Sequence, residues 1–153
     1  VYTLQIYLTW ATTTLVKPET KFWREIKKNL PEFKWVRLES WATQGVPDLL
    51  GFAEDGTIFT IELKVAKGRK VHFSPHQIAF HVEHQDSPCL ILVKRVSKSK
   101  PLDSELFLFS SSQVQAVSEQ GLDTRPLYTT PYPVPWSEVR DALLDALACY
   151  RKK

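Results

Sequence analysis

Three charged residues interrupt two short apolar runs near the middle of the chain. Asp48 comes directly before the run at 49–52, and Glu62 and Lys64 lie within the run at 58–65. A strand that packs into a core normally lacks ionisable side chains, because burying an unpaired charge is costly. If both runs are core strands, some partner must compensate these charges.

A predicted hairpin brings the three charges together. Asp55-Gly56 is typical of a two-residue turn, here between a strand that ends at residue 54 and one that begins at residue 57. Residues two apart on a strand share a face, so Glu62 and Lys64 point one way while residues 61, 63 and 65 point the other. The hairpin then folds Asp48 back beside Glu62.

This set of charges suits a metal ion and a phosphodiester. Two carboxylates about 4 Å apart repel by roughly 4 kcal/mol at an effective dielectric constant of about 20, and a divalent cation removes that repulsion. Mg²⁺ prefers one or two carboxylates together with water and phosphate oxygens, and a lysine on the same face can hold a water or a developing phosphorane oxygen. The alternative is a solvated Glu62–Lys64 pair on an exposed edge strand, with Asp48 in an ordinary Pro-Asp turn.

Length and composition favour one globular domain. The chain has 153 residues, of which 43% are hydrophobic and 24% charged. Its net charge of +3 permits nucleic acid as a partner without requiring it. No apolar run is long enough to span a membrane, so no membrane partner is expected. Cys89 and Cys149 lie in apolar segments without metal-ligand spacing, which predicts reduced core thiols in a cytoplasmic protein.

The apolar periodicity and the turn residues predict an α/β domain built on one mixed β-sheet flanked by helices. Helices are expected at 19–30, 74–85, 111–121 and 136–150, and strands at 33–43, 89–96 and 105–110 besides the two of the hairpin; a proline-rich connector precedes the last helix. The core, 19–110, has the order αβββαβ, and 111–153 is an extension of the same domain. Residues 1–18 form an arm without the basic region of a signal peptide, so secretion is not expected.

The stretch that carries Asp48, Glu62 and Lys64 resembles the PD-(D/E)xK nuclease superfamily. Within it, the segments ETKFW, RLES, GVPDLLG, TIELK and RKVHFSPHQIAFH resemble the virus-type replication-repair (VRR-NUC) nucleases, especially stand-alone phage forms. The resemblance covers residues 19–96. It implies a metal-dependent DNA endonuclease on a restriction-endonuclease-like fold, in a bacterial or phage-infected host cytoplasm. Many such relatives are homodimers that cut branched DNA such as Holliday junctions.

The resemblance also implies roles for individual residues. Asp48, Glu62 and the Leu63 carbonyl are expected to bind Mg²⁺ or Mn²⁺, with no small-molecule cofactor. Lys64 would orient the attacking water or help to deprotonate it. The number of metal ions stays open at this point.

Relatives often carry a metal-organising glutamate on the first helix, where this chain has Glu19 and Glu25. At about 100° per residue, Glu19 falls at the centre of the apolar face formed by residues 22, 23, 26 and 30, and Glu25 falls outside it. This favours Glu19 as a further ligand, directly or through water. The alternative is that Glu19 only interacts with the helix dipole or caps the first turn.

A glutamine of the next helix faces the active site in relatives, and Gln77 matches it. The sequence S-P-H-Q at 74–77 also fits a capping box, in which Gln77 returns to the Ser74 backbone. Both interpretations stay open. His81 and His84 lie on the Gln77 side of the helix and are interpreted as packed histidines rather than as phosphate contacts.

A basic loop follows Lys64 and is expected to contact DNA phosphate through Lys67, Arg69, Lys70 and His72. The alternative is a solvated run of charges. The sequence contains no apparent base-reading motif, which favours recognition of junctions or flaps by shape. A sequence-specific restriction-type endonuclease and a non-catalytic DNA-binding protein on the same fold are the competing functions.

A homodimer is expected from the two ends of the chain. The first sixteen residues carry no charge, and the helix at 136–150 has an apolar face formed by residues 139, 143, 147 and 150. Both could form a two-fold interface. Burial of the helix against its own sheet is the alternative.

Overall fold

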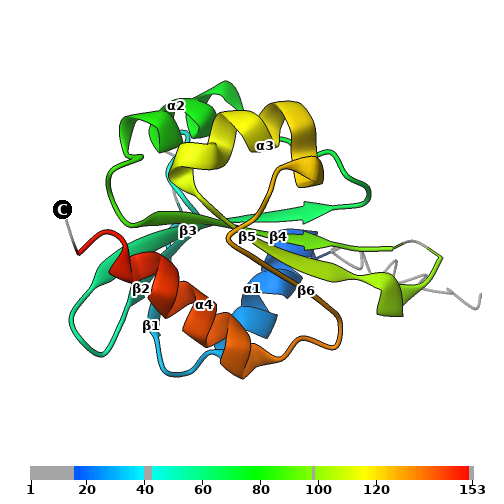
Figure 1. The fold of residues 1–153 in the computed structure, drawn as a ribbon, viewed down its shortest axis with the longest axis horizontal. Helices are drawn as coiled ribbons and strands as arrows, with labels where there is room; N and C mark the ends of the chain where they lie inside the picture. The colour runs from blue at the N-terminus through cyan, green and yellow to red at the C-terminus, as the bar shows by residue number, and fades with distance from the viewer. Residues whose placement is uncertain (1–15, 40–42, 98, 152–153) are drawn as a thin grey trace, which may run out of the picture.

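A six-stranded sheet forms the centre of the computed structural model, which describes residues 16–39, 43–97 and 99–151. Helices cover both faces of the sheet, as Figure 1 shows. Residues 1–15 of the predicted N-terminal arm lie outside the described residues. The prediction of an α/β domain on one mixed sheet is confirmed.

The elements follow the expected order. They are α1 (Pro18–Asn29), β1 (Lys34–Arg37), β2 (Leu49–Phe52), β3 (Ile58–Ala66), α2 (Pro75–Glu83), β4 (Cys89–Arg95), η1 (Pro101–Asp103), β5 (Glu105–Ser110), η2 (Ser111–Gln113), α3 (Val114–Gln120), η3 (Gly121–Asp123), β6 (Tyr128–Pro131) and α4 (Trp136–Ala148). The described part of the predicted strand at 33–43 is a strand only at 34–37, and residues 40–42 lie outside the described residues.

Strand order in the sheet equals strand order in the sequence, and only β3 and β4 pair in parallel. A parallel pair needs a long crossover connection, and the segment that contains α2 supplies it. In this pair Glu62 lies beside Ile91 and Lys64 beside Val93. The crossover places α2 over the sheet face to which these two charged side chains point.

Two apolar layers enclose the sheet. The first lies between the sheet and the helices α1 and α4, and it includes Ile61 and Leu63 of β3. The second lies between the sheet and α3, with Ile78 of α2 packed against it, and it includes Ile91 and Val93 of β4. Strand alternation therefore directs Glu62 to the side opposite Ile61 and Leu63, as predicted.

The C-terminal segment belongs to the same sheet. The predicted proline-rich connector contains β6, which pairs antiparallel with β5 as an edge strand, a position that tolerates Pro131. Helix α4 buries Val139, Leu143 and Leu147 in the first apolar layer. The apolar face of α4 thus packs against its own sheet and does not supply the expected dimer interface.

The two cysteines differ. Cys89 is buried at the start of β4, whereas Cys149 is exposed after α4, so the prediction that both are core thiols is wrong for Cys149. Cys149 follows the turn that ends α4, where its side chain need not enter the core. Within the described ranges no helix is long and apolar enough to cross a membrane.

Candidate active site

The β2–β3 hairpin positions Asp48 against β3. Gly56 has a φ of +85° in the turn, a conformation that glycine adopts without steric cost, and the Ala53 amide donates to the Thr57 carbonyl. Asp48 lies one residue before β2, and its Oδ2 accepts a 2.8 Å hydrogen bond from the Leu63 amide. This bond holds the carboxylate next to Glu62, the neighbour of Leu63 in the chain.

Glu62 is the most deeply buried acidic side chain at this place, with 1% of its surface exposed. Its Oε1 accepts a very short hydrogen bond from Gln77 Nε2 and lies 3.2 Å from Lys64 Nζ. Its Oε2 is also buried but has no hydrogen-bond partner among the described residues. Buried polar atoms normally have a partner, so Oε2 is an acceptor that a bound cation would satisfy.

Gln77 serves both roles that the sequence left open. The capping box forms, because the Gln77 amide donates to Ser74 Oγ at 3.2 Å and Gln77 Oε1 accepts from the Ser74 amide at 3.0 Å. The same Oε1 accepts from Lys64 Nζ at 2.8 Å. The start of α2 therefore fixes the side chain that joins Glu62 to Lys64.

Lys64 is held from three sides. Besides Glu62 and Gln77, its Nζ lies 5.0 Å from the centre of the Phe73 ring, within the range of a cation–π contact. These contacts hold the ammonium group in one position. Phe73 was not expected at the site, because nothing in its local sequence marks it.

Glu19 lies at the site, as the periodicity of its helix predicted, whereas Glu25 forms an ion pair with Lys94 at 2.5 Å. Glu19 lines a hollow of about 570 Å³ together with Lys64 and residues 65–72. It also stands in the first turn of α1, so its proposed interaction with the helix dipole is compatible with a role at the site. Arg37, at the end of β1, was not expected there, and its charge acts on Asp48.

Burial and mutual repulsion disfavour the charged forms of the two carboxylates. Burial raises the pKa of Asp48, although the Leu63 amide and Lys64 oppose the shift and Glu19 adds to it. Burial raises the pKa of Glu62 to about 7, with a further rise from Asp48 and opposition from Lys64 and Gln77. A bound cation would relieve this repulsion.

The donor set fits a hard divalent cation. Within the described ranges, no three His, Cys, Asp or Glu side chains converge as metal ligands, so side chains alone do not complete a site. Mg²⁺ needs only one or two carboxylates, with water and phosphate oxygens for the remainder. The Asp48 carboxylate and Glu62 Oε2 would supply the two carboxylate ligands. The Leu63 carbonyl is a third, because a strand residue directs its carbonyl to the same edge as its amide, and the Leu63 amide meets Asp48.

The raised pKa of Glu62 predicts how the metal-free protein responds to pH. Between pH 4.5, the ordinary value, and about pH 7 the folded protein binds more protons at Glu62 than the unfolded chain. The free energy of unfolding should therefore fall as pH rises through this window, by at most about 1.4 kcal/mol per pH unit. Glu62→Gln should lack this fall, and the exposed residue Glu54 supplies a matched control, Glu54→Gln.

Urea unfolding in EDTA at several pH values from 4.5 to 8 measures this effect. We expect Glu62→Gln to be more stable than the wild type by about 1–3 kcal/mol at pH 8 and equal to it near pH 4.5. Adding Mg²⁺ at pH 8 should stabilise the wild type and Glu54→Gln but not Glu62→Gln. Parallel pH profiles for the wild type and Glu62→Gln would contradict the assignment.

The basic loop lies beside the hollow. Lys67, Lys70 and His72 are exposed, whereas Val71 is buried in the second apolar layer. Arg69 is half exposed, and its guanidinium donates to Asp123 and to the Leu122 carbonyl. The structure thus places Lys67, Lys70 and His72 at the site with their side chains exposed. Arg69 is also at the site, but two of its donor groups already bond to the protein.

His81 of α2 and His84, the residue directly after α2, are packed, as predicted. His81 is fully buried, and its Nδ1 lies 2.7 Å from Ser111 Oγ. Burial lowers the pKa of His81 to about 4, with a further contribution from Lys64. The His84 ring stacks on the Phe80 ring, and His84 Nδ1 lies 2.8 Å from the Phe80 carbonyl oxygen.

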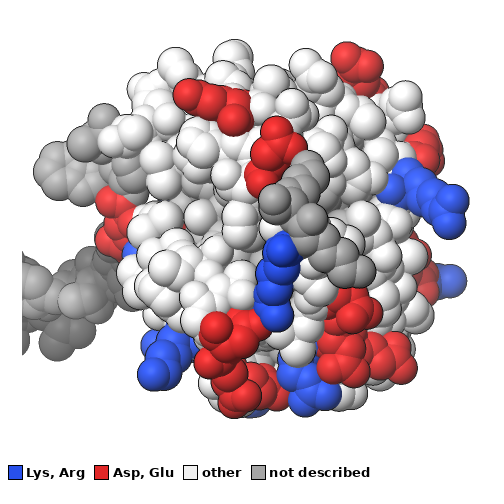
Figure 2. Space-filling view, turned by 60° about the vertical axis from the view of Figure 1, so that its left-hand side comes forward, with Lys and Arg blue, Asp and Glu red and all other residues white. Residues whose placement is uncertain are grey.

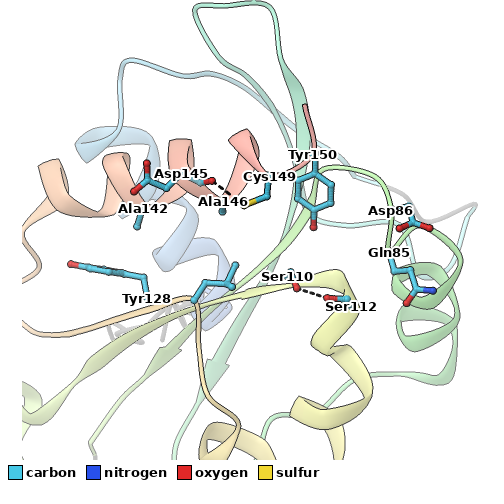
Figure 3. A pocket seen from close by; sticks show the side chains of 11 residues that line it. Gln85, Asp86, Ser110, Ser112, Tyr128, Ala142, Asp145, Ala146, Cys149 and Tyr150 are labelled. Atoms are coloured by element: carbon cyan, nitrogen blue, oxygen red, sulfur yellow. Dashed lines mark hydrogen bonds between the residues drawn. The ribbon is translucent and has the colours of Figure 1, made fainter. Parts of the chain in front are cut away.

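A separate hollow lies at the other end of the sheet, between α4 and β5 (Figure 3). It measures about 550 Å³, and its charged lining residues are Asp86 and Asp145, with no lysine or arginine. Figure 2, which turns this end forward, shows more acidic than basic groups on the surface. Phosphate groups would be repelled here, whereas Lys64, Lys67, Arg69 and Lys70 line the hollow beside Glu19.

A scan against models of known protein families finds no match to this chain, and a search of curated proteins finds no similar one.

Proposed function

We propose that this protein is a Mg²⁺- or Mn²⁺-dependent nuclease that hydrolyses DNA phosphodiester bonds on a restriction-endonuclease-like fold of the PD-(D/E)xK type. The state of Glu62 carries the proposal. One of its oxygens is held by Lys64 and Gln77, and the other is buried beside the Asp48 carboxylate without a partner among the described residues. A divalent cation stabilises a pair of this kind, because it neutralises the repulsion between the two carboxylates.

Each residue of the site has a part in the proposed reaction. Asp48, Glu62 and the Leu63 carbonyl would hold the metal ion, and Glu19 would reach it through water. When bound, such an ion polarises the phosphoryl oxygen and stabilises the leaving oxyanion. Lys64 donates a hydrogen bond that orients the attacking water, and Gln77 keeps the ammonium group in place.

The hollow beside Lys64 is the proposed path of the DNA backbone. Lys67, Lys70 and His72 would contact its phosphates, which positions the nucleic acid without reading sequence. We therefore propose selection by DNA shape, with Holliday junctions or flaps as substrates. A homodimer stays a prediction; of the two segments expected at its interface, α4 packs against its own sheet, and residues 1–15 lie outside the described residues.

Digestion of a set of labelled DNA molecules tests the proposal. The set contains a Holliday junction, a flap, a splayed arm, a single strand and a plain duplex, each with Mg²⁺, Mn²⁺ or EDTA. Metal-dependent cutting of the branched molecules in preference to the duplex is expected. Cutting of the duplex at a fixed sequence would favour the restriction-type alternative. Binding without cutting in either metal would favour the non-catalytic alternative and contradict the proposal.

A further inference from the structure

The turn after α3 holds the basic loop by its backbone and by its arginine. The Leu122 amide donates to the Arg69 carbonyl at 2.8 Å. In return, the Arg69 guanidinium donates to the Leu122 carbonyl at 2.7 Å and to Asp123 Oδ1 at 2.6 Å. Two segments more than fifty residues apart in the chain are thus joined by reciprocal bonds around one residue of the loop.

Gly121 makes this close approach possible. A Cβ atom added to Gly121 would lie 2.0 Å from the Arg69 carbonyl oxygen, too close for any side chain. Its backbone, with φ +62° and ψ −139°, is close to a region that only glycine adopts readily. The position therefore requires glycine for two independent reasons, both of which serve the contact with the loop.

The contact continues into the core. Leu122 and Val71 are both buried in the second apolar layer, so the turn and the loop pack against the same helix, α3. The loop residues Lys67 and Lys70 flank Arg69 and line the hollow that also contains Lys64. Because the contacts of Arg69 hold the loop backbone in place, the backbone positions of the neighbouring Lys67 and Lys70 are fixed as well.

We infer that the turn at 121–123 is a positioning device for the DNA-contacting loop, and that Arg69 acts as its tether rather than as a phosphate contact. The inference rests on the proposed function, because the loop needs a substrate to position. It also gives the C-terminal extension a part in substrate binding: α3 and η3 fix the lysines that meet the DNA backbone.

The sign of a charge change separates a tether from a simple electrostatic effect. Asp123 is 69% exposed, and removing its negative charge should strengthen DNA binding if only the net charge near the loop matters. If Asp123 anchors Arg69, the same change should weaken binding, because the neutral oxygen of asparagine holds the guanidinium less tightly than a carboxylate and the lysines lose part of their fixed geometry. Glu119 of α3 is also exposed, so Glu119→Gln removes an equal charge from the same segment without touching Arg69.

The experiment compares the wild type, Asp123→Asn and Glu119→Gln in binding to a fluorescent four-way junction and to a duplex, with Ca²⁺ in place of Mg²⁺. Asp123→Asn is expected to bind about threefold to tenfold more weakly, and its KM for cleavage in Mg²⁺ should rise with little change in kcat. Glu119→Gln should bind at least as tightly as the wild type. In the DNA-free protein, amide hydrogen exchange at Leu122 should accelerate only in Asp123→Asn.

A second variant, Gly121→Ala, should weaken DNA binding by about tenfold or more if circular dichroism shows that this variant folds. If Gly121→Ala does not fold, the result for Asp123→Asn decides between the two explanations. Binding by Asp123→Asn as tight as that by Glu119→Gln would overturn the inference while leaving the proposed function standing. A wild-type protein that binds neither DNA would instead overturn the proposed function, and the inference with it.

Discussion

Replacing Asp48 with alanine is expected to reduce DNA cleavage in Mg²⁺ by about 10³-fold or more, and replacing Glu62 with alanine should have the same effect. A bound metal ion contributes several kcal/mol to transition-state stabilisation, and about 1.4 kcal/mol corresponds to a factor of ten in rate. Either change removes one of the two carboxylates that would hold the ion, so the ion would bind more weakly and in a less defined position.

The fold of both variants should survive. Burial raises the pKa of both wild-type carboxylates, and repulsion by Asp48 raises that of Glu62 further. Removing one relieves the repulsion, so the melting temperature of the metal-free variants at pH 8 should equal or exceed that of the wild type. Unaltered circular dichroism together with lost cleavage would assign the loss to chemistry.

Glu54→Ala is the matched control for these two variants. Glu54 is an exposed acidic residue at the turn of the same hairpin, outside the set of proposed metal ligands. It should cut at the wild-type rate. Wild-type cleavage by Asp48→Ala or Glu62→Ala, measured in single turnover with saturating Mg²⁺, would exclude the metal site that we propose.

Replacing Lys64 with alanine is expected to slow the chemical step by about 10²-fold or more, a typical loss for one electrostatic or acid–base group. Metal binding at saturating Mg²⁺ should remain, because Lys64 donates hydrogen bonds and offers the ion no ligand. The rate of a single turnover measures the chemical step apart from DNA binding and product release.

The pH dependence gives the Lys64 variant a second signature. Lys64 opposes the rise in the pKa of Glu62, so its removal should raise that pKa further. More protons must then leave before a metal ion can bind, and the Mg²⁺ requirement at pH 7 should increase relative to that at pH 9.

Lys67→Ala, in the exposed loop, provides the contrast to this variant. It should mainly raise KM, because it removes a proposed phosphate contact and leaves the reacting atoms unchanged. An unaltered single-turnover rate in Lys64→Ala would reduce Lys64 to an ion-pair partner of Glu62 and would remove it from the proposed mechanism.

The local sequence was sufficient to predict features that depend only on residues close together in the chain. The alternation of Ile61, Glu62 and Leu63 places the carboxylate opposite the apolar layer, because a strand has a period of two. The capping box of Ser74 and Gln77 depends on four consecutive residues, and the turn at 55–56 on two. The period of α1 likewise directs Glu19, and not Glu25, to the hollow.

Tertiary structure decided every feature that joins distant segments. Arg37 lies close enough to act on the Asp48 carboxylate only because β1 pairs with β2. Phe73 contacts Lys64 only because the loop between them folds back toward β3. The exposed Asp123 engages Arg69 across 54 residues, a contact for which neither local sequence contains a signal.

The same reason explains the C-terminal segment. Its amphipathic helix could bury an apolar face against a partner or against its own sheet, and the sequence pattern is identical in both cases. Pairing of β6 with β5 decides between them, because it extends the sheet and brings α4 back over the first apolar layer. Strand and helix periods are local, so the amino-acid sequence alone specifies which side chains share a face. Which faces meet depends on long-range packing, and only the folded chain settles that.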